Sequence, residues 1–398
     1  MSEYQVYEFQ TIDRALTAEE RSELNTWSSR SKASSHKIKF TYSYGDFSRN
    51  TESVMFQYFD AMSYWANYGV KEIIFRFPKD TINKKAIIPY TFSENIELRS
   101  KGDYVLLIFR ENVEDGGYEE WWDDDETVLS DLIGLRQAIM EGDYRALYLA
   151  WLYFHSPNSK APFDVDYYDE EEDDSFDYDG DEVMAAKMRA VEPPMPAGLG
   201  DLSADLQIFA SFWGLSEDWI KAAALASKPK QSAALDLPKL IANLSAAEKE
   251  EFLVRLAKQE PNLGQILLKK LEGFRTKELE EEGAKPRKME EIAELADNIM
   301  NQRIASEKAA SEAKKLVELN RIHNAKDIYW RGVERDLALK SGKGYDEAVE
   351  MLQKLSQVAE VFGEKSEFIA TYQRVLSDYK SSLALKKRIS AAGLPTNY

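Results

Sequence analysis

One acidic run constrains what this 398-residue chain can fold into. Residues 164–182 (DVDYYDEEEDDSFDYDGDE) contain twelve Asp and Glu and no Lys or Arg. A block of like charges repels itself and stays solvated, so we expect a linker rather than part of a core. The pattern before this run indicates mixed strand and helix, and the pattern after it indicates helix.

A second acidic segment accounts for most of the remaining charge imbalance. Residues 111–126 carry nine Asp and Glu and no base. Without the two segments, 49 acidic residues stand against 51 Lys and Arg, so the net charge of −19 belongs to them. A near-neutral remainder without a basic stripe disfavours a general nucleic-acid binder.

The chain has no cysteine. Disulfides, Cys-ligated zinc, iron–sulfur clusters and a Cys nucleophile are therefore excluded. The N-terminus shows no basic region followed by an apolar run, and no stretch approaches the ~18 apolar residues of a membrane span. We expect a cytoplasmic protein with no membrane partner and no cofactor.

The first 157 residues predict an α+β domain of strands and helices. Thr17 and Glu20 match a capping box, which opens a helix. Residues 51–68 have apolar positions at helical spacing, and residues 144–154 are apolar nearly all round, which predicts a buried helix. Strands are predicted at 3–12, 36–44, 73–77, 87–92, 96–99 and 104–110.

The remainder predicts a linker followed by an all-helical C-terminal half of three segments. An acidic and Pro/Gly-rich linker spans 158–200, and a helical domain spans 201–285, where Ser245 and Glu248 form another capping box. A long helix is expected over 286–340, followed by a terminal helical hairpin over 341–398. A heptad register runs from Ile292 to Leu316. Half of its seam is Ala or polar, which indicates one exposed helix or a weak coiled-coil surface.

Basic residues concentrate late in the chain, among them Lys380, Lys386, Lys387 and Arg388. Because acids interleave with the late basic residues, we expect a mixed solvated surface. A positive face for RNA or an acidic partner, or docking with the central acidic run, is the alternative. Ser341-Gly-Lys-Gly344 lacks the phosphate-loop pattern and predicts a turn.

Several stretches resemble a family of uncharacterised bacterial proteins with a YYEF-x-AIDRPLT-type N-terminus. They are EYQVYEF-TIDRALTAEE at the start, GDF at 45–47, GDYRALYLAWL at 142–152, PPMPAGLGDLSADL at 193–206 and the terminal YDEAVEML…RISAAGL. The helical C-terminal half, including LPKLIANLSAAEKEEFLVRLAKQEPNLGQILLKKL, resembles that of bacterial SWIM zinc-finger proteins. The zinc finger has no counterpart in this chain. The resemblance implies a helical interaction or assembly module and no particular activity.

The acidic run has two further readings besides a solvated linker. Ser175-x-Asp177-x-Asp179-Gly180 matches the first half of a calcium-binding EF-hand loop, but Ala186 stands where a bidentate Glu is required. Aromatic residues interleave with the acids, which indicates docking on a basic partner. The candidate partner-binding residues are Trp121, Trp122, Tyr167, Tyr168, Asp169, Glu170, Glu171, Glu172, Phe176 and Tyr178.

No catalytic or metal site can be assigned from motifs. His36, His155 and His323 have no metal-ligand or triad spacing, and we expect structural or surface roles for them. The patterns G-x-S-x-G and G-x-G-x-x-G do not occur. We therefore expect a non-enzymatic cytoplasmic interaction or scaffold protein that binds another protein. The alternatives are an enzyme with an unrecognised site in the N-terminal domain and an acidic nucleic-acid mimic.

Overall fold

The computed structural model describes residues 4–43, 45–112, 128–157, 159, 180–230, 237–258, 260, 263–279 and 285–396. The chain divides into two compact units, Met1–Met300 and Asn301–Tyr398, each with its own hydrophobic core. The predicted fold class is confirmed, because the first unit combines a sheet with helices and the second is helical. The finer boundaries expected at 157, 200, 285 and 340 stay predictions.

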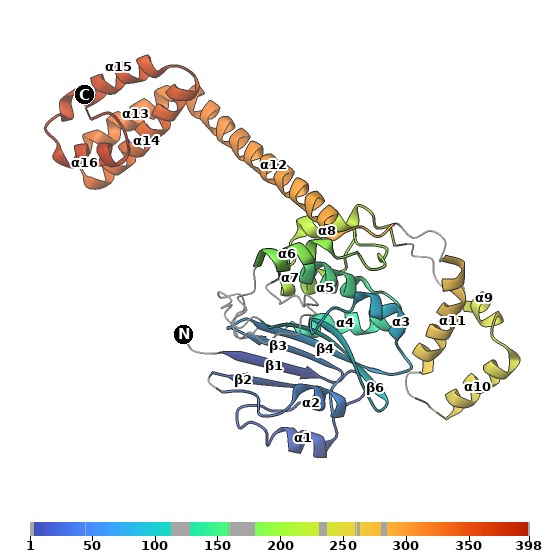
Figure 1. Ribbon diagram of the computed structural model, residues 1–398. Coiled ribbons are helices and arrows are strands. Elements are labelled where there is room, and N and C mark those ends of the chain that lie inside the picture. Colours follow the sequence, from blue (N-terminus) through green and yellow to red (C-terminus); the bar gives the residue numbers. More distant parts are fainter. Residues whose placement is uncertain are drawn as a thin grey trace, which may run out of the picture. The chain divides into compact units, whose positions relative to one another are not determined.

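A six-stranded antiparallel sheet organises the first unit (Figure 1). Its strand order is β2-β1-β3-β4-β6-β5, so β4 and β3 are central. Lys101 pairs with Tyr104 at the tight turn between β5 and β6. The strands are β1 (Gln5–Gln10), β2 (Lys37–Tyr42), β3 (Ala61–Ala66), β4 (Val70–Pro78), β5 (Ile96–Lys101) and β6 (Tyr104–Asn112).

Both faces of this sheet are buried, by different sets of helices (Figure 1). Helices α1 (Ala18–Leu24) and α2 (Thr51–Gln57) cover one face, where Phe9, Met62 and Ile74 lie in the core. Helices α4 (Leu129–Met140), α5 (Arg145–His155) and α7 (Ala204–Trp213) cover the other. Alternate residues of β4 and β6 enter the two cores, as the period of two in a strand requires.

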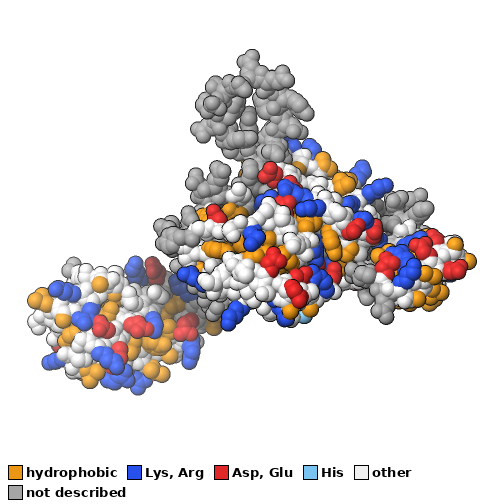
Figure 2. Space-filling model, turned by 90° about the horizontal axis from the view of Figure 1, so that it is seen from below, with side chains coloured by type: hydrophobic (Ala, Val, Ile, Leu, Met, Phe, Trp, Pro, Cys, Tyr) orange, Lys and Arg blue, Asp and Glu red, His pale blue; other side chains and the backbone are white. Residues whose placement is uncertain are grey.

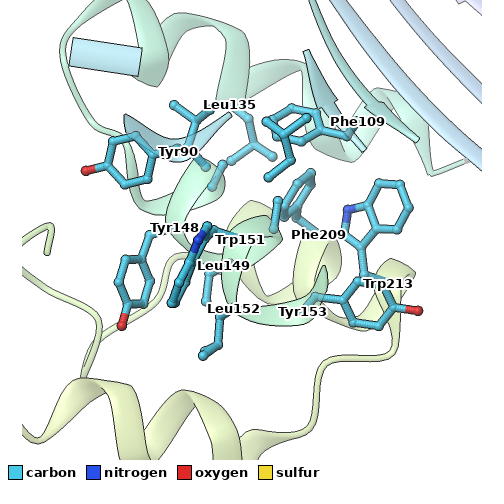
Figure 3. Close-up of a cluster of buried hydrophobic side chains, with 14 of the residues drawn as sticks. Tyr90, Phe109, Leu135, Tyr148, Leu149, Trp151, Leu152, Tyr153, Phe209 and Trp213 are labelled. Carbon is cyan, nitrogen blue, oxygen red and sulfur yellow. The ribbon is translucent and has the colours of Figure 1, made fainter. Parts of the chain in front are cut away.

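The core between the sheet and helices α4, α5 and α7 is the larger of the two in the first unit, and α5 lies at its centre. All eleven residues of α5 are buried, which confirms the prediction for 144–154. Figure 3 shows Phe109 of β6 and Phe209 of α7 close to α5, with ring centroids 5.3 Å apart. Residues as late as Ala296 belong to this core. It therefore unites segments from both sides of the acidic run.

Further helices complete the first unit. They are α3 (Lys84–Ile87), the 3₁₀ helix η1 (Ile88–Tyr90), α6 (Gly180–Arg189), α8 (Glu217–Ala224), α9 (Leu237–Ala242), α10 (Ala246–Ala257) and α11 (Leu263–Leu279). Both predicted capping boxes, at Thr17 and Ser245, are present. Nowhere in the described ranges does a helix combine the length and apolar character needed to cross a membrane.

A buried ion network joins α4 to the sheet. Asp60 is fully buried, and its carboxylate accepts hydrogen bonds from Arg76 (2.7 Å) and from the backbone N–H groups of Ile12 and Asp13 (2.6 and 2.9 Å). Arg136 of α4 donates to both carboxylate oxygens of Asp13 and to the carbonyl of Arg76. Burial alone would raise the pKa of Asp60, but the two guanidinium groups hold it below its ordinary value.

The second unit is a small helical bundle. Its helices are the end of α12 (Met289–Asn324), α13 (Lys326–Ala338), α14 (Gly342–Val361), α15 (Lys365–Leu376), η2 (Ser377–Tyr379) and α16 (Leu383–Ala391). Val333, Leu352, Tyr372 and Leu385 are buried in its core. The predicted long helix ends at Asn324, and α13 begins at Lys326. In the terminal hairpin predicted over 341–398, α14 is followed by α15, η2 and α16 rather than by one second helix.

One predicted helix, 51–68, is wrong in its second half. The helix ends at Gln57, and residues Ala61–Ala66 form β3. The apolar residues Met55, Phe59, Met62 and Ala66 fit a helical spacing, but Met62, Tyr64 and Ala66 also alternate as a strand requires. Pairing of β3 with both β1 and β4 decides between the two. Short apolar runs carry this ambiguity in general.

The strand predicted at 87–92 is also wrong, because residues 84–90 are helical. The side chain of Asn83 accepts a hydrogen bond from the Ala86 N–H and caps α3. Pro89 cannot donate to a sheet ladder, whereas it fits the first turn of η1.

Replacing Asp60 with Ala should destabilise the first unit strongly. The substitution leaves buried Arg76 without its counter-charge, whereas Arg136 keeps Asp13, and such a loss costs about 3–5 kcal/mol in comparable sites. Urea unfolding followed by tryptophan fluorescence measures the change. Asp103→Ala is the matched control, because Asp103 pairs with Lys79 on the surface with its side chain 83% exposed. Equal unfolding midpoints for the two variants would contradict the importance of the network.

Candidate functional site

The ten residues predicted to bind a partner lie outside the described residues. They are Trp121, Trp122, Tyr167, Tyr168, Asp169, Glu170, Glu171, Glu172, Phe176 and Tyr178. Their docking role therefore stays a prediction. The structure does describe the residues that flank both acidic segments, and these residues meet.

Five buried polar residues gather where the acidic segments join the fold, and we refer to them as the Glu111 cluster. They are Lys71 of β4, Glu111 of β6, Tyr153 and His155 of α5, and Lys187 of α6. Each is at most 7% exposed, and Glu111 is fully buried. Glu111 is the first residue of the 111–126 segment, and Lys187 follows the end of the 164–182 run by five residues.

Glu111 is the centre of this cluster. It stands opposite Lys71 in the pairing of β4 with β6. The Tyr153 hydroxyl lies 2.8 and 2.9 Å from its two carboxylate oxygens. The negative charge of Glu111 also acts on both lysines. A buried carboxylate needs such partners, because burying it alone would be very unfavourable.

The two lysines attach neighbouring segments to the cluster. Lys71 donates a hydrogen bond to the carbonyl of Phe212 at the end of α7 (2.8 Å). Lys187 donates to the carbonyl of Ser159, which precedes the 164–182 run (3.0 Å). Burial lowers the pKa of both lysines, and the charge of Glu111 opposes that effect. Lys187 thus joins the two flanks of the central acidic run.

His155 has a structural environment at the end of α5. Its ring lies between Phe92 and Trp151, with centroid distances of 4.3 and 4.5 Å. Nδ1 is 2.8 Å from the carbonyl oxygen of Trp151. Burial lowers the pKa of His155 to about 4, the hydrogen bond to Trp151 opposes this, and Lys187 adds to it. The imidazole is therefore neutral at pH 7.

A small cavity lies at the opposite end of α5. Its volume is about 20 Å³, enough for one water molecule. Asp143, Arg145 and Asp205 contribute its polar lining. Arg145 is already bound to Asp143 and to the carbonyls of Gly198 and Asp201. We assign this cavity no chemistry.

Within the described ranges no group of three His, Asp or Glu side chains could hold a metal ion. No protein-family model, curated protein or solved structure matches the chain. The geometry of the site therefore has to be interpreted from its own residues.

Sequence reasoning missed the Glu111 cluster. Glu111 was grouped with the acidic segment, whereas it is the penultimate residue of β6. The only signal was Lys71, a charged residue on the same side of β4 as Ile73 and Phe75. No sequence pattern could have shown that Lys187 reaches the same place from the far side of the acidic run.

Acid should destabilise the fold through His155. The folded-state pKa of about 4 lies below the ordinary 6.5, so the unfolded chain binds a proton that the folded chain does not. Above pH 6.5 neutral His155 makes its full contribution to the free energy of unfolding. This contribution falls by about 3 kcal/mol as the pH drops to 4. His155→Phe should remove this part of the pH dependence, measured by urea unfolding at several pH values. His36→Gln, at an exposed site, should retain it.

Proposed function

We propose that this chain is a non-enzymatic, cytoplasmic interaction or scaffold protein whose acidic segments bind a basic partner protein. The Glu111 cluster is the observation that supports this proposal. Through Glu111, Ser159 and Lys187 it brings one end of the 111–126 segment and both flanks of the 164–182 run to one place. Two segments that are remote in the sequence can then act on one partner.

Such an arrangement would act chiefly on the rate of association. Apart from buried Glu111, the two segments carry twenty carboxylates attached near one point, and these attract a basic surface over a distance comparable to the Debye length. Figure 2 shows the face that carries α1 and α2, where Lys and Arg are interspersed with Asp and Glu. A mixed surface of this kind contributes little steering, so the acidic segments dominate the field. The interleaved aromatic residues would supply apolar contact after encounter.

The resemblance to the bacterial family and to the helical half of SWIM zinc-finger proteins belongs to the same proposal. A helical unit with its own core, placed after a different N-terminal unit, is what a reusable assembly module requires. The boundaries of that module are also part of the proposal.

One observation favours the enzymatic alternative. Burial lowers the pKa of Lys71 and Lys187 beside a carboxylate and a phenol, and such groups occur in proton-transfer sites. Replacing Lys187 by Met distinguishes the two functions. Slower or weaker partner binding by a folded Lys187→Met protein, in which the flanks of the acidic run are no longer joined, supports the interaction role, whereas loss of a turnover activity would support the enzyme.

Neutralising the twelve carboxylates of 164–182 with Asn and Gln should slow association with the partner. The partner is first isolated from the native host with the full chain as bait and identified by mass spectrometry. We expect the association rate constant to fall by at least about tenfold at low ionic strength and to differ little at high salt. The dissociation rate should change less, because steering acts before contact.

The control variant carries twelve neutralised carboxylates taken from exposed positions outside both acidic segments. It should retain most of the association rate. An equal rate for the wild type and the 164–182 variant at low ionic strength would refute the steering role. Competition of the partner by duplex DNA would instead favour the nucleic-acid mimic.

A further inference from the structure

The Ser341-Gly-Lys-Gly344 motif has a structural role that differs from the predicted turn. Ser341 caps α14, its hydroxyl accepting a hydrogen bond from the Gly344 N–H (3.0 Å), and the helix begins at Gly342. A Cβ atom at Gly344 would lie 2.4 Å from the carbonyl oxygen of Asp336, so no larger residue fits. The end of α13 and the start of α14 therefore approach backbone to backbone.

Helix α16 packs beside this junction. Arg388 donates a hydrogen bond from Nε to the Asp346 carboxylate (2.5 Å). Its guanidinium lies next to Gly342, 3.4 Å from where a Cβ would be. Three elements thus meet at one exposed end of the second unit.

Positive charge predominates at this junction. Lys340 and Lys343 belong to the connection and the first turn of α14, and Lys387 precedes Arg388 on α16. Arg388 neutralises Asp346, and Lys343, whose side chain is 87% exposed, lies 3.8 Å from Glu347. Of these four cations, Lys343 and Arg388 are paired with carboxylates, and Lys340 and Lys387 add net positive charge. The second unit as a whole has 17 Lys and Arg against 13 Asp and Glu.

Two large apolar side chains are exposed beside these cations. Leu339, at the end of α13, is 62% exposed, and its Cβ is 3.2 Å from where a Gly344 Cβ would lie. Leu383 is 76% exposed and lies one turn before Lys387 on α16. Each leucine offers a ligand apolar contact next to a lysine.

We propose that Leu339, Lys340, Lys343, Leu383, Lys387 and Arg388 form a docking site for an acidic peptide segment with apolar side chains, presented by a partner protein. Charge complementarity selects an acidic ligand. The exposed leucines favour a peptide over a nucleic acid, because a phosphate backbone offers them no apolar contact. Asp346 and Glu347 also interrupt the continuous positive surface that a phosphate backbone would require.

This site differs from the proposed acidic docking region in location and in sign of charge. Loss of the 164–182 carboxylates should leave it intact, so the two proposals can fail separately. A chain with one site for a basic partner and another for an acidic partner could connect two proteins.

Fluorescence anisotropy of the full chain with a labelled synthetic peptide that alternates Glu and Leu tests the proposal. The site variant combines Lys340→Asn, Lys343→Gln and Lys387→Gln, since Asn tolerates the positive φ of 47° at position 340. We expect it to weaken peptide binding by at least about tenfold at low ionic strength. A peptide with Ser in place of Leu should bind the wild type similarly weakly.

The control variant, Lys308→Gln, Lys314→Gln and Lys315→Gln, removes the same charge from exposed positions of α12. It should bind within about twofold of the wild type. Equal weakening by both variants would overturn the site, because binding would then reflect general positive charge. So would unchanged binding of the site variant, or tighter binding of single-stranded DNA than of the peptide. Circular dichroism confirms that both variants remain folded.

Discussion

The buried carboxylate of Asp60 is the interaction on which the first unit depends. It holds the start of β3 against β4 through Arg76, and it binds the backbone that follows β1. Arg136 extends the same network to α4. Helix α5 follows α4 after a short connection, and its last turn carries Tyr153 and His155. The two members of the Glu111 cluster on α5 therefore follow, in the chain, a helix that this network fixes to the sheet.

Because the sheet is buried on both faces, some of its strands could be predicted from the sequence and others could not. The apolar runs of β4 and β6 were found, because a strand covered on both sides is nearly continuous in apolar residues. The end of α2 and the start of β3 were missed, because Met62, Tyr64 and Ala66 satisfy both periods. Only the pairing of residues 61–66 with two neighbouring strands shows that this segment is a strand rather than a helix. The helices of the C-terminal half were easier, since capping residues such as Ser245 mark their first turns directly.

The candidate site was less predictable than the fold, for a physical reason. Counting charges along the sequence identified the acidic segments. Such a count does not show which of their flanking residues lie close together in the folded chain. The rest of the first acidic segment, α4, α5 and the whole second acidic segment lie between Glu111 and Lys187 in the sequence, and the two residues meet only because β6, α5 and α6 pack together. Even the cationic junction of the second unit depends on a contact between Gly344 and the Asp336 backbone that no pattern encodes. Local chemistry was visible in the sequence, whereas its convergence required the tertiary structure.

Helix α12 contributes buried residues to both units. Its first turns place Met289, Ile292 and Ala296 in the core of the first unit, and Leu319 and Ile322 are buried in the second. Every residue from 301 to 318 is exposed. Tertiary packing supplies most of the stability of helices in proteins, and this stretch has none of its own. It depends on its two packed ends, which remove the cost of nucleating the helix. Side-chain pairs such as Arg303 with Glu307 add to its stability. A helix stretch that is polar all round is stabilised by such side-chain pairs rather than by burial of an apolar face.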